Sequence, residues 1–383
     1  MKKKTLYICL DEPVGIFQIE KIIKMNLVLK NFKVKFISSE NLFFSKKQIE
    51  NYFKFTPKKE IPKKISKFKN LKEWEIFLKS ITKDDLFFSF RDTKKNKLNT
   101  NDIELFKRKN IRTLFLSEAP KIEYNFKKSL FINLLGFIND NFVKFIKFFK
   151  RKNSFQATFL IGSGELSYRN FLRKDVASSY INLPSYWIDF SKKKTKKDII
   201  TYVDESIFYS RDVNLSNQKD KRCSNPIKFL SDLNNFFKLL ESKTNYEIVI
   251  ACSKKSFKYT KDIFNKRKIV YGKTSEYISK SRLVLGHSSE SLNQAIYNEV
   301  PVQCLKHKTF SFKRNYRIER KSSNIFNKNS FFIEDYLKGK HNMKLSIDRR
   351  FYKNVLYKYY ITKNLKFENF SKKFKTVIER KIK

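Results

Sequence analysis

The sequence predicts an α/β protein with two domains, each built around a parallel sheet. Its 383 residues are too many for one ordinary hydrophobic core. Short apolar runs typical of buried strands alternate with amphipathic helical segments, and they do so in two separate series. Between the series lies SKKKTKK, residues 191–197, a charged run without an apolar side chain that we interpret as a linker.

The first domain, residues 1–190, opens with TLYICL, a helical pattern and FKVKFIS, the order that begins a parallel sheet. Residues 42–72 are lysine-rich and weakly periodic, which indicates a peripheral excursion. NTNDIELFKRKN is expected to be a helix capped by Asn99 or Thr100. The strands are expected at 5–10, 32–38, 84–90, 111–120, 157–164 and 178–190.

The second domain, residues 198–345, repeats this alternation. Its strands are expected at 198–206, 246–253, 268–272, 282–289 and 300–305. Its helices are expected at 226–240, 258–267, 274–281 and 290–299. Residues 346–383 are basic and aromatic, so we expect basic C-terminal helices, with packing back on the first domain as one option.

The net charge of +47 favours anionic partners: nucleic acid, anionic lipid or phosphate-bearing substrates. Compositional drift is the alternative, because lysine accounts for most of the basic residues while glycine and proline number only seven each. Arginine, which reads bases and phosphates best, is a minority, and the sequence contains no recognised nucleic-acid motif. Nucleic acid is therefore kept as an alternative partner and is not the expected one.

The four cysteines have no CxxC spacing, so we expect neither a metal site nor a redox pair. The first apolar stretch ends at Asp11, too early for a signal peptide, and no run approaches the about 20 apolar residues of a spanning helix. We expect a cytoplasmic protein. Residues 127–152, apolar on one side and basic at both ends, favour either a peripheral helix on an anionic inner membrane face or a core-packed helix.

The stretch LVLGHSSESLNQAIYNEVPVQCL reads as strand, turn, helix and strand, and lysine is absent from it. Its small residues fall at the carboxyl end of the strand, where open α/β sheets bind ligands. Gly286 would allow close approach of a ligand, and Ser288, Ser289 and Ser291 are good N-cap residues. The turn could therefore hold a phosphate on free N–H and hydroxyl groups. An ordinary capped turn without a ligand is the alternative.

This segment resembles the nucleotide-sugar end of GT-B glycosyltransferases, including bacterial sialyltransferase-like and surface-polysaccharide enzymes. Their small-residue turn, helix and K/V-P-V/I strand are matched here by GHSS, ESLNQAIYN and VPV. Upstream, YVDESIFYSRD, YEIVIACSKKS and VYGKTSEYISKS are similar to successive motifs of the same proteins. The match covers residues 198–305, and the first domain is similar in architecture alone.

The resemblance implies two Rossmann-like domains facing a cleft, and metal-independent transfer of a sugar from a nucleotide-activated donor. The acceptor would be lipid-linked or a surface glycan, as in capsule or lipopolysaccharide assembly. It implies no tightly bound cofactor, because the nucleotide sugar is a co-substrate. The residues expected to bind the donor and its phosphates are Gly286, Ser288, Ser289, Ser291, Lys273, Thr274 and Lys254.

Transfer to a hydroxyl needs a base, which the resemblance places on the first domain. Asp11, Glu12 and Glu118 follow predicted strands there, and His287 is the histidine retained at the turn, so these four are the catalytic candidates. Gly162 and Gly164 follow another strand and are candidates for close approach of a ligand.

The family's histidines are replaced by the SR of FYSRD and the SK of ACSKK. Either another group acts in catalysis, or the chain is a non-catalytic GT-B relative that binds a nucleotide or glycan.

Overall fold

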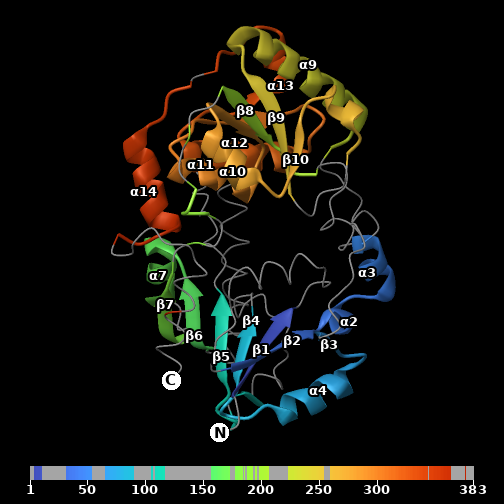
Figure 1. Cartoon of the computed structure of the whole chain (residues 1–383), viewed down its shortest axis with the longest axis vertical. Coiled ribbons are helices and arrows are strands. Elements are labelled where there is room, and N and C mark those ends of the chain that lie inside the picture. Colours follow the sequence, from blue (N-terminus) through green and yellow to red (C-terminus); the bar gives the residue numbers. More distant parts are fainter. Residues whose placement is uncertain are drawn as a thin grey trace, which may run out of the picture.

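The computed structural model describes residues 4–10, 32–53, 65–89, 105–116, 157–172, 177–206, 223–253, 259–363 and 376, apart from positions 107, 184, 186–187, 193–194, 196–197 and 344. These residues form two α/β units, each around a parallel sheet (Figure 1). The predicted fold class is thereby confirmed.

The first sheet has seven strands among the described residues, in the order β3-β2-β1-β4-β5-β6-β7, and all neighbouring pairs are parallel. The arrowheads of β1, β4 and β5 point toward the second unit (Figure 1). The strands are β1 (Lys4–Leu10), β2 (Phe32–Ser38), β3 (Ile65–Lys67), β4 (Leu86–Ser89), β5 (Arg112–Leu116), β6 (Ala157–Gly162) and β7 (Ala177–Asn182). The described helices are α2 (Glu40–Phe43), α3 (Lys46–Phe53), α4 (Leu71–Ser80) and α7 (Gly164–Leu172).

The second sheet has six strands in the described part of the chain, in the order β10-β9-β8-β11-β12-β13, and again all pairs are parallel. The strands are β8 (Ile199–Val203), β9 (Glu247–Cys252), β10 (Ile269–Tyr271), β11 (Leu283–Gly286), β12 (Val302–Lys306) and β13 (Phe331–Phe332). The helices are α9 (Pro226–Thr244), η2 (Lys261–Phe264), α10 (Thr274–Lys280), η3 (Glu290–Asn293), α11 (Gln294–Tyr297), α12 (Phe312–Phe326), α13 (Ile333–Leu337) and α14 (Arg349–Tyr359).

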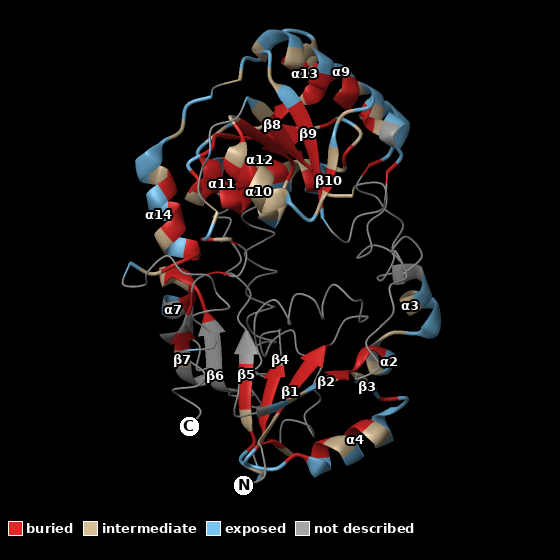
Figure 2. Cartoon of the chain, in the orientation of Figure 1, coloured by how far each residue is buried: buried red, intermediate tan, exposed pale blue. Residues whose placement is uncertain are grey.

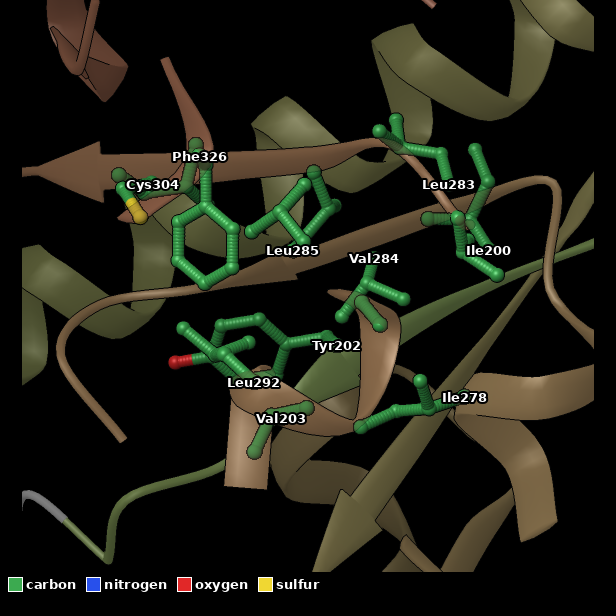
Figure 3. Packing of buried hydrophobic residues seen from close by; sticks show 14 of the residues in the cluster. Ile200, Tyr202, Val203, Ile278, Leu283, Val284, Leu285, Leu292, Cys304 and Phe326 are labelled. Atoms are coloured by element: carbon green, nitrogen blue, oxygen red, sulfur yellow. The ribbon is translucent and has the colours of Figure 1, made fainter. Parts of the chain in front are cut away.

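The central strands of both sheets are buried on both faces, as crossover helices require (Figure 2). In β11, for example, Leu283, Val284 and Leu285 are at most 1% exposed, although their side chains alternate between the two faces. Figure 3 shows them packed with Ile200 and Tyr202 of the neighbouring strand β8. Continuous apolar runs such as RLVLG are therefore the sequence signature of these central strands.

Helix α14 joins the two units. Tyr352 and Val355 are buried in the core of the second unit, and the Tyr352 hydroxyl donates to the Val300 carbonyl oxygen. At its carboxyl end the helix packs on α7, where Ser163 Oγ donates to the Tyr359 carbonyl oxygen at 3.4 Å. The basic C-terminal segment thus begins with a helix that contacts both units.

Several predicted elements differ from the structure. The predicted excursion at 42–72 contains α3 and the edge strand β3, a strand too short to show a period. The helix predicted at 258–267 is reduced to the single 3₁₀ turn η2, and the helix predicted at 290–299 is split into η3 and α11. β13 and α12 were not predicted. The helix 127–152 lies outside the described residues, among which no helix is both long and apolar enough to cross a membrane.

A glycine at the junction provides a test of this packing. Gly164 begins α7 with φ of +71°, and a Cβ there would lie 2.5 Å from the backbone carbonyl carbon of Tyr359. Gly339 has a similar φ of +73°, but a Cβ there would have no neighbour within 4 Å. Gly339→Ala should therefore lower the free energy of unfolding by about 1–2 kcal/mol, from backbone strain alone. Gly164→Ala should lower it by clearly more, because α14 must also move away.

Urea unfolding of both variants measures this difference. Equal losses of stability in the two variants would contradict the close packing of α14 on α7.

Candidate functional site

The second sheet reverses its strand order between the neighbouring strands β8 and β11. Such a reversal at the carboxyl edge is where open α/β sheets bind ligands. β8 is followed there by Asp204 and Glu205, and β11 by His287 and Ser288. The polar residues that meet at this reversal, named the edge cluster below, are Asp204, Glu205, His287, Ser288, Ser289, Arg314 and Lys321.

Glu205 is the centre of the edge cluster. Its carboxylate accepts the backbone N–H of Ser288, and its Oε2 lies 2.9 Å from Nη2 of Arg314. The side chains of Glu205 and Arg314 are only 14% and 8% exposed, so the pair is largely removed from water. Burial alone would raise the pKa of Glu205, but the positive charges near it, that of Arg314 foremost, and the Ser288 N–H together outweigh burial and lower that pKa. Glu205 is therefore an ionised carboxylate held against the turn.

Lys321 contacts the same turn through its buried side chain. Its side chain is 1% exposed, and Nζ donates to the Ser289 carbonyl oxygen at 2.9 Å and pairs with Glu290 at 3.2 Å. Lys321 follows Arg314 by seven positions in α12, so the helix presents both cations on one side. α12 thus supplies Lys321, which contacts the turn directly, and Arg314, which acts on it through Glu205.

His287 lies inside the domain and not at its surface. It has no exposed area, and its Nδ1 lies 2.6 Å from the Leu305 carbonyl oxygen. A carbonyl only accepts, so Nδ1 carries the proton, and Nε2 accepts from the Tyr202 hydroxyl at 2.9 Å. Burial lowers the pKa of His287 to about 4. The ring is thus neutral at pH 7 and links β8 to β12 across β11.

Asp204 is a buried acid beside this cluster, 6% exposed. Its Oδ2 accepts from the Tyr259 hydroxyl and from the Ser206 backbone N–H, both at 3.0 Å, and lies 3.8 Å from Cys252 Sγ. Burial raises the pKa of Asp204 to about 6, although these hydrogen bonds oppose the shift. The site therefore holds two adjacent carboxyl groups whose pKa values move in opposite directions.

The turn that was predicted to bind phosphate is present, but the N–H groups of Ser288 and Ser291 already donate hydrogen bonds to side chains of the same domain. Ser289 is the N-cap of η3 and its Oγ accepts the Ser291 N–H at 3.2 Å, while Glu205 accepts the Ser288 N–H. A Cβ on Gly286 would lie 2.9 Å from Leu292, so the close approach at this glycine is to the following helix. The turn therefore already holds an anion, the carboxylate of Glu205.

The other predicted residues lie apart from this turn. Lys273 is exposed and Thr274 begins α10, at the carboxyl end of β10, two strands away from β8. Gly162 and Gly164 are in the first unit, where a Cβ would meet the side chains of Ser167 and Tyr180 or the backbone of α14. Asp11, Glu12, Glu118 and Lys254 lie outside the described residues.

Sequence reasoning missed Asp204, Glu205, Arg314 and Lys321 as members of the site. A signal for the two acids exists, since DES directly follows the buried run IITYV. For Arg314 and Lys321 the only sequence signal is their spacing of seven residues, and no helix or strand was predicted in that segment. Their place beside the turn depends on the packing of α12 against β12, which the sequence pattern does not specify.

No protein-family model matches the chain, and no curated protein matches its sequence. Solved structures match its fold. The wall teichoic acid polymerase TagF is similar at 11% identity with a TM-score of 0.50, over 99% of this chain and 89% of that one. MurG of Acinetobacter baumannii is 9% identical with a TM-score of 0.48, over 98% and 99% of the two chains.

A third similar structure is UGT2 of Phytolacca americana, complexed with UDP-2fluoro-glucose and pterostilbene. It is 10% identical with a TM-score of 0.47, and 93% of each chain is covered. At such identities the likeness concerns the fold: the chain has the two parallel-sheet domains of the GT-B type. The GT-B part of the predicted resemblance is confirmed, and its sialyltransferase-like part stays a prediction.

Because Glu205 and Arg314 form a buried ion pair, we expect their contributions to the free energy of unfolding to be strongly coupled. Arg314→Met leaves an ionised, buried carboxylate without its partner, so we expect a loss of about 3–5 kcal/mol in the free energy of unfolding. The double variant Glu205→Gln/Arg314→Met should lose less than Arg314→Met alone, because no unpaired charge remains. Urea unfolding of the double-mutant cycle measures this.

The exposed pair of Arg349 and Glu299 supplies the control, and Arg349→Met should change stability by less than about 1 kcal/mol. Additive effects at Glu205 and Arg314 would refute the coupling.

The raised pKa of Asp204 predicts that the stability of the protein depends on pH. Its folded pKa of about 6 exceeds the ordinary 3.8, so its contribution is fully present below pH 4 or so and is lost as pH rises through about 6. Asn can accept the hydrogen bonds made to Oδ2 without carrying a charge. Asp204→Asn should therefore be up to about 3 kcal/mol more stable than the wild type at pH 8 and gain nothing near pH 4. Thermal unfolding from pH 4 to pH 8 tests this, and a gain independent of pH would contradict it.

Proposed function

We propose that the chain is a glycosyltransferase that binds a nucleotide-activated sugar at the carboxyl edge of its second sheet. The observation that carries this proposal is the edge cluster, which gathers buried charges at the point where the strand order of the second sheet reverses. The GT-B fold supports the same assignment, because it is the architecture of nucleotide-sugar transferases.

The edge cluster also suggests how the donor would be bound. Lys321 and the Glu205–Arg314 pair hold the Ser288–Ser289 turn in place, so its hydroxyls are pre-positioned at the edge of the sheet. Glu205 engages the Ser288 N–H and, at 3.5 Å, the Ser288 hydroxyl, so a donor phosphate would have to replace this longer contact. We assign the donor phosphates to the serine hydroxyls, and we keep Lys273, Thr274 and Lys254 as proposed contacts elsewhere on the donor. His287 is buried and neutral. Its proposed role is therefore to position the turn and not to transfer a proton.

The acceptor is assigned to the first unit, whose strands point toward the second (Figure 1). Asp11, Glu12 and Glu118, which follow β1 and β5 in the sequence and lie outside the described residues, are the proposed candidates for the base that accepts the hydroxyl proton. A lipid-linked or surface-glycan acceptor, and a cytoplasmic location at the inner membrane face, agree with the charge of +47.

A thermal-shift screen tests the donor assignment. A matching UDP-, CMP-, GDP- or dTDP-sugar at 100 times its Kd should stabilise the wild type by about 2.7 kcal/mol. Ser288→Ala/Ser289→Ala should lose most of this shift, because both hydroxyls contact the donor. Ser323→Ala is the control, since Ser323 is an exposed serine on the outer side of α12. Absence of stabilisation by every donor would refute the site.

Release of the nucleotide on adding a glycan acceptor then separates catalysis from binding. Donor binding without release would favour the non-catalytic GT-B relative, and salt-dependent binding of nucleic acid without donor binding would favour the basic nucleic-acid-binding protein.

A further inference from the structure

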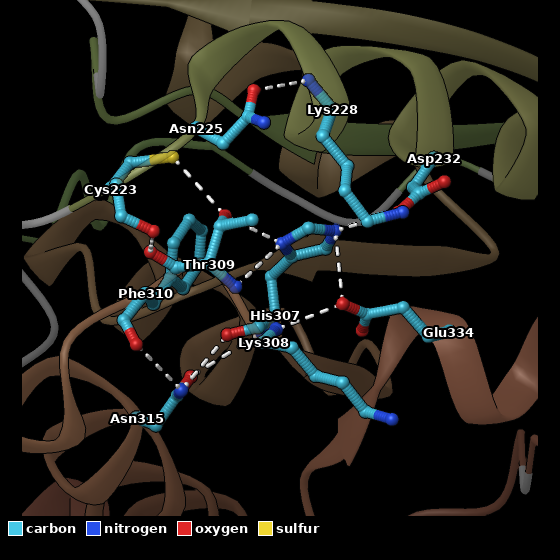
Figure 4. A network of polar contacts seen from close by, with 11 residues as sticks. Cys223, Asn225, Lys228, Asp232, His307, Lys308, Thr309, Phe310, Asn315 and Glu334 are labelled. Carbon is cyan, nitrogen blue, oxygen red and sulfur yellow. Dashed lines mark hydrogen bonds and ion pairs between the residues drawn. The ribbon is translucent and has the colours of Figure 1, made fainter.

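A second polar cluster lies one strand beyond the edge cluster, at the carboxyl end of β12 (Figure 4). His307 directly follows β12, Asp232 belongs to α9 and Glu334 to α13. The His307 ring is fully buried, and its Nε2 lies 3.1 Å from Asp232 Oδ2 and 3.2 Å from Glu334 Oε1. One imidazole and two carboxylates thus converge from three separate elements.

We propose that Asp232, His307 and Glu334 bind a divalent transition-metal ion, Zn²⁺ foremost, which fastens α9 and α13 to the end of β12. One ligand atom from each residue lies within 4.8 Å of the other two. Around a tetrahedral zinc ion with bonds of about 2.1 Å, neighbouring ligand atoms are about 3.4 Å apart. The two distances from His307 are close to this value.

The kind of ligand narrows the choice of metal. Mg²⁺ and Ca²⁺ prefer sites made wholly of oxygen, whereas imidazole nitrogen favours zinc and its neighbours in the first transition row. One nitrogen and two carboxylate oxygens leave room for a fourth ligand, such as water.

A carboxylate oxygen without a partner points to a ligand independently of these distances. Glu334 is 9% exposed, and its Oε2 is buried with no hydrogen-bond partner among the described residues. The other oxygen, Oε1, accepts the Lys308 N–H at 2.9 Å. In Figure 4 the Glu334 oxygen that faces the His307 ring is Oε1, and Oε2 is the outer oxygen of the same carboxylate. A buried acceptor without a donor is destabilising, and a cation held by both oxygens of Glu334 would supply the missing interaction.

Thr309 contacts the far side of the His307 ring and sets its tautomer. Thr309 donates its N–H to Nδ1 at 3.2 Å, so the neutral ring carries its proton on Nε2, toward the two carboxylates. The Thr309 hydroxyl lies 2.7 Å from Nδ1 and can accept a hydrogen bond from it when Nδ1 is protonated. A metal ion on Nε2 would move the ring proton to Nδ1, so the Thr309 N–H would give up its hydrogen bond and Thr309 Oγ1 would become the outer-shell partner that orients the ring.

Lys228 is the cation with which a metal ion would compete. Its Nζ lies 3.0 Å from Asp232 Oδ2, but 55% of its side chain is exposed, so it can swing into solvent. The carboxylates of Asp232 and Glu334 carry two negative charges, and Lys228 carries one positive charge. The described groups around the neutral His307 ring therefore have a net negative charge, which favours a divalent cation. The site is separate from the proposed donor site, and the Phe229 ring contacts both His307 and His287.

Titration of the chelator-treated full-length chain with ZnCl₂ by calorimetry tests the site, with Co²⁺ as a spectroscopic probe. We expect one ion per chain, a rise in Tm and a visible Co²⁺ absorption band. Asp232→Asn and Glu334→Gln should each weaken binding by at least about tenfold. Lys228→Gln should tighten it several-fold, because the competing cation is removed.

His341→Gln is the matched control for adventitious binding, since His341 is an exposed histidine of the same unit. Binding that is absent from the wild type, or is unchanged in Asp232→Asn, overturns the proposal. Binding that appears only in Lys228→Gln also overturns it, because Lys228 would then be the native cation of the cluster.

Discussion

The second domain is organised around the need to bury the charge of Glu205. An ionised carboxylate that is largely removed from water is stable only when paired and hydrogen-bonded. Glu205 meets this requirement through the N–H of Ser288 and the guanidinium of Arg314. These contacts tie the end of β8 to the turn after β11 and to α12. The strand reversal, the turn and the helix therefore form one electrostatic unit.

The remaining buried polar groups at this edge are hydrogen-bonded within the domain. His287 is kept neutral by burial and lies between the Tyr202 hydroxyl and the Leu305 carbonyl, while Lys321 donates to the carbonyl oxygens of the turn. Asp204 is the exception, because burial raises its pKa to about 6 and its hydrogen bonds do not fully compensate. A buried acid with a raised pKa lowers the stability of the domain at neutral pH. Such an acid beside a pre-positioned turn is typical of a ligand-binding site.

Among the described residues, the packing of α14 joins the two domains. Tyr352 and Val355 of α14 are buried in the second core, and the end of the same helix lies against Gly164 of α7. The close approach at this glycine is made by the chain's own backbone. Its position after a strand suggested a place for a ligand, but the structure gives it a role in joining the two domains.

The sequence by itself determined the two parallel sheets, because their central strands are buried on both faces and must be continuous apolar runs such as ICL and LVLG. It also located the turn at Gly286–Ser289, in which Ser289 caps the next helix by a local hydrogen bond. Only the tertiary structure decided that Glu205 occupies this turn, that His287 is buried, and that His307 meets Asp232 and Glu334. Those contacts join residues 18 to 85 positions apart. Local periodicity encodes which face of a strand or helix is apolar, but partners so distant are set by how α9, α12 and α13 pack on the sheet.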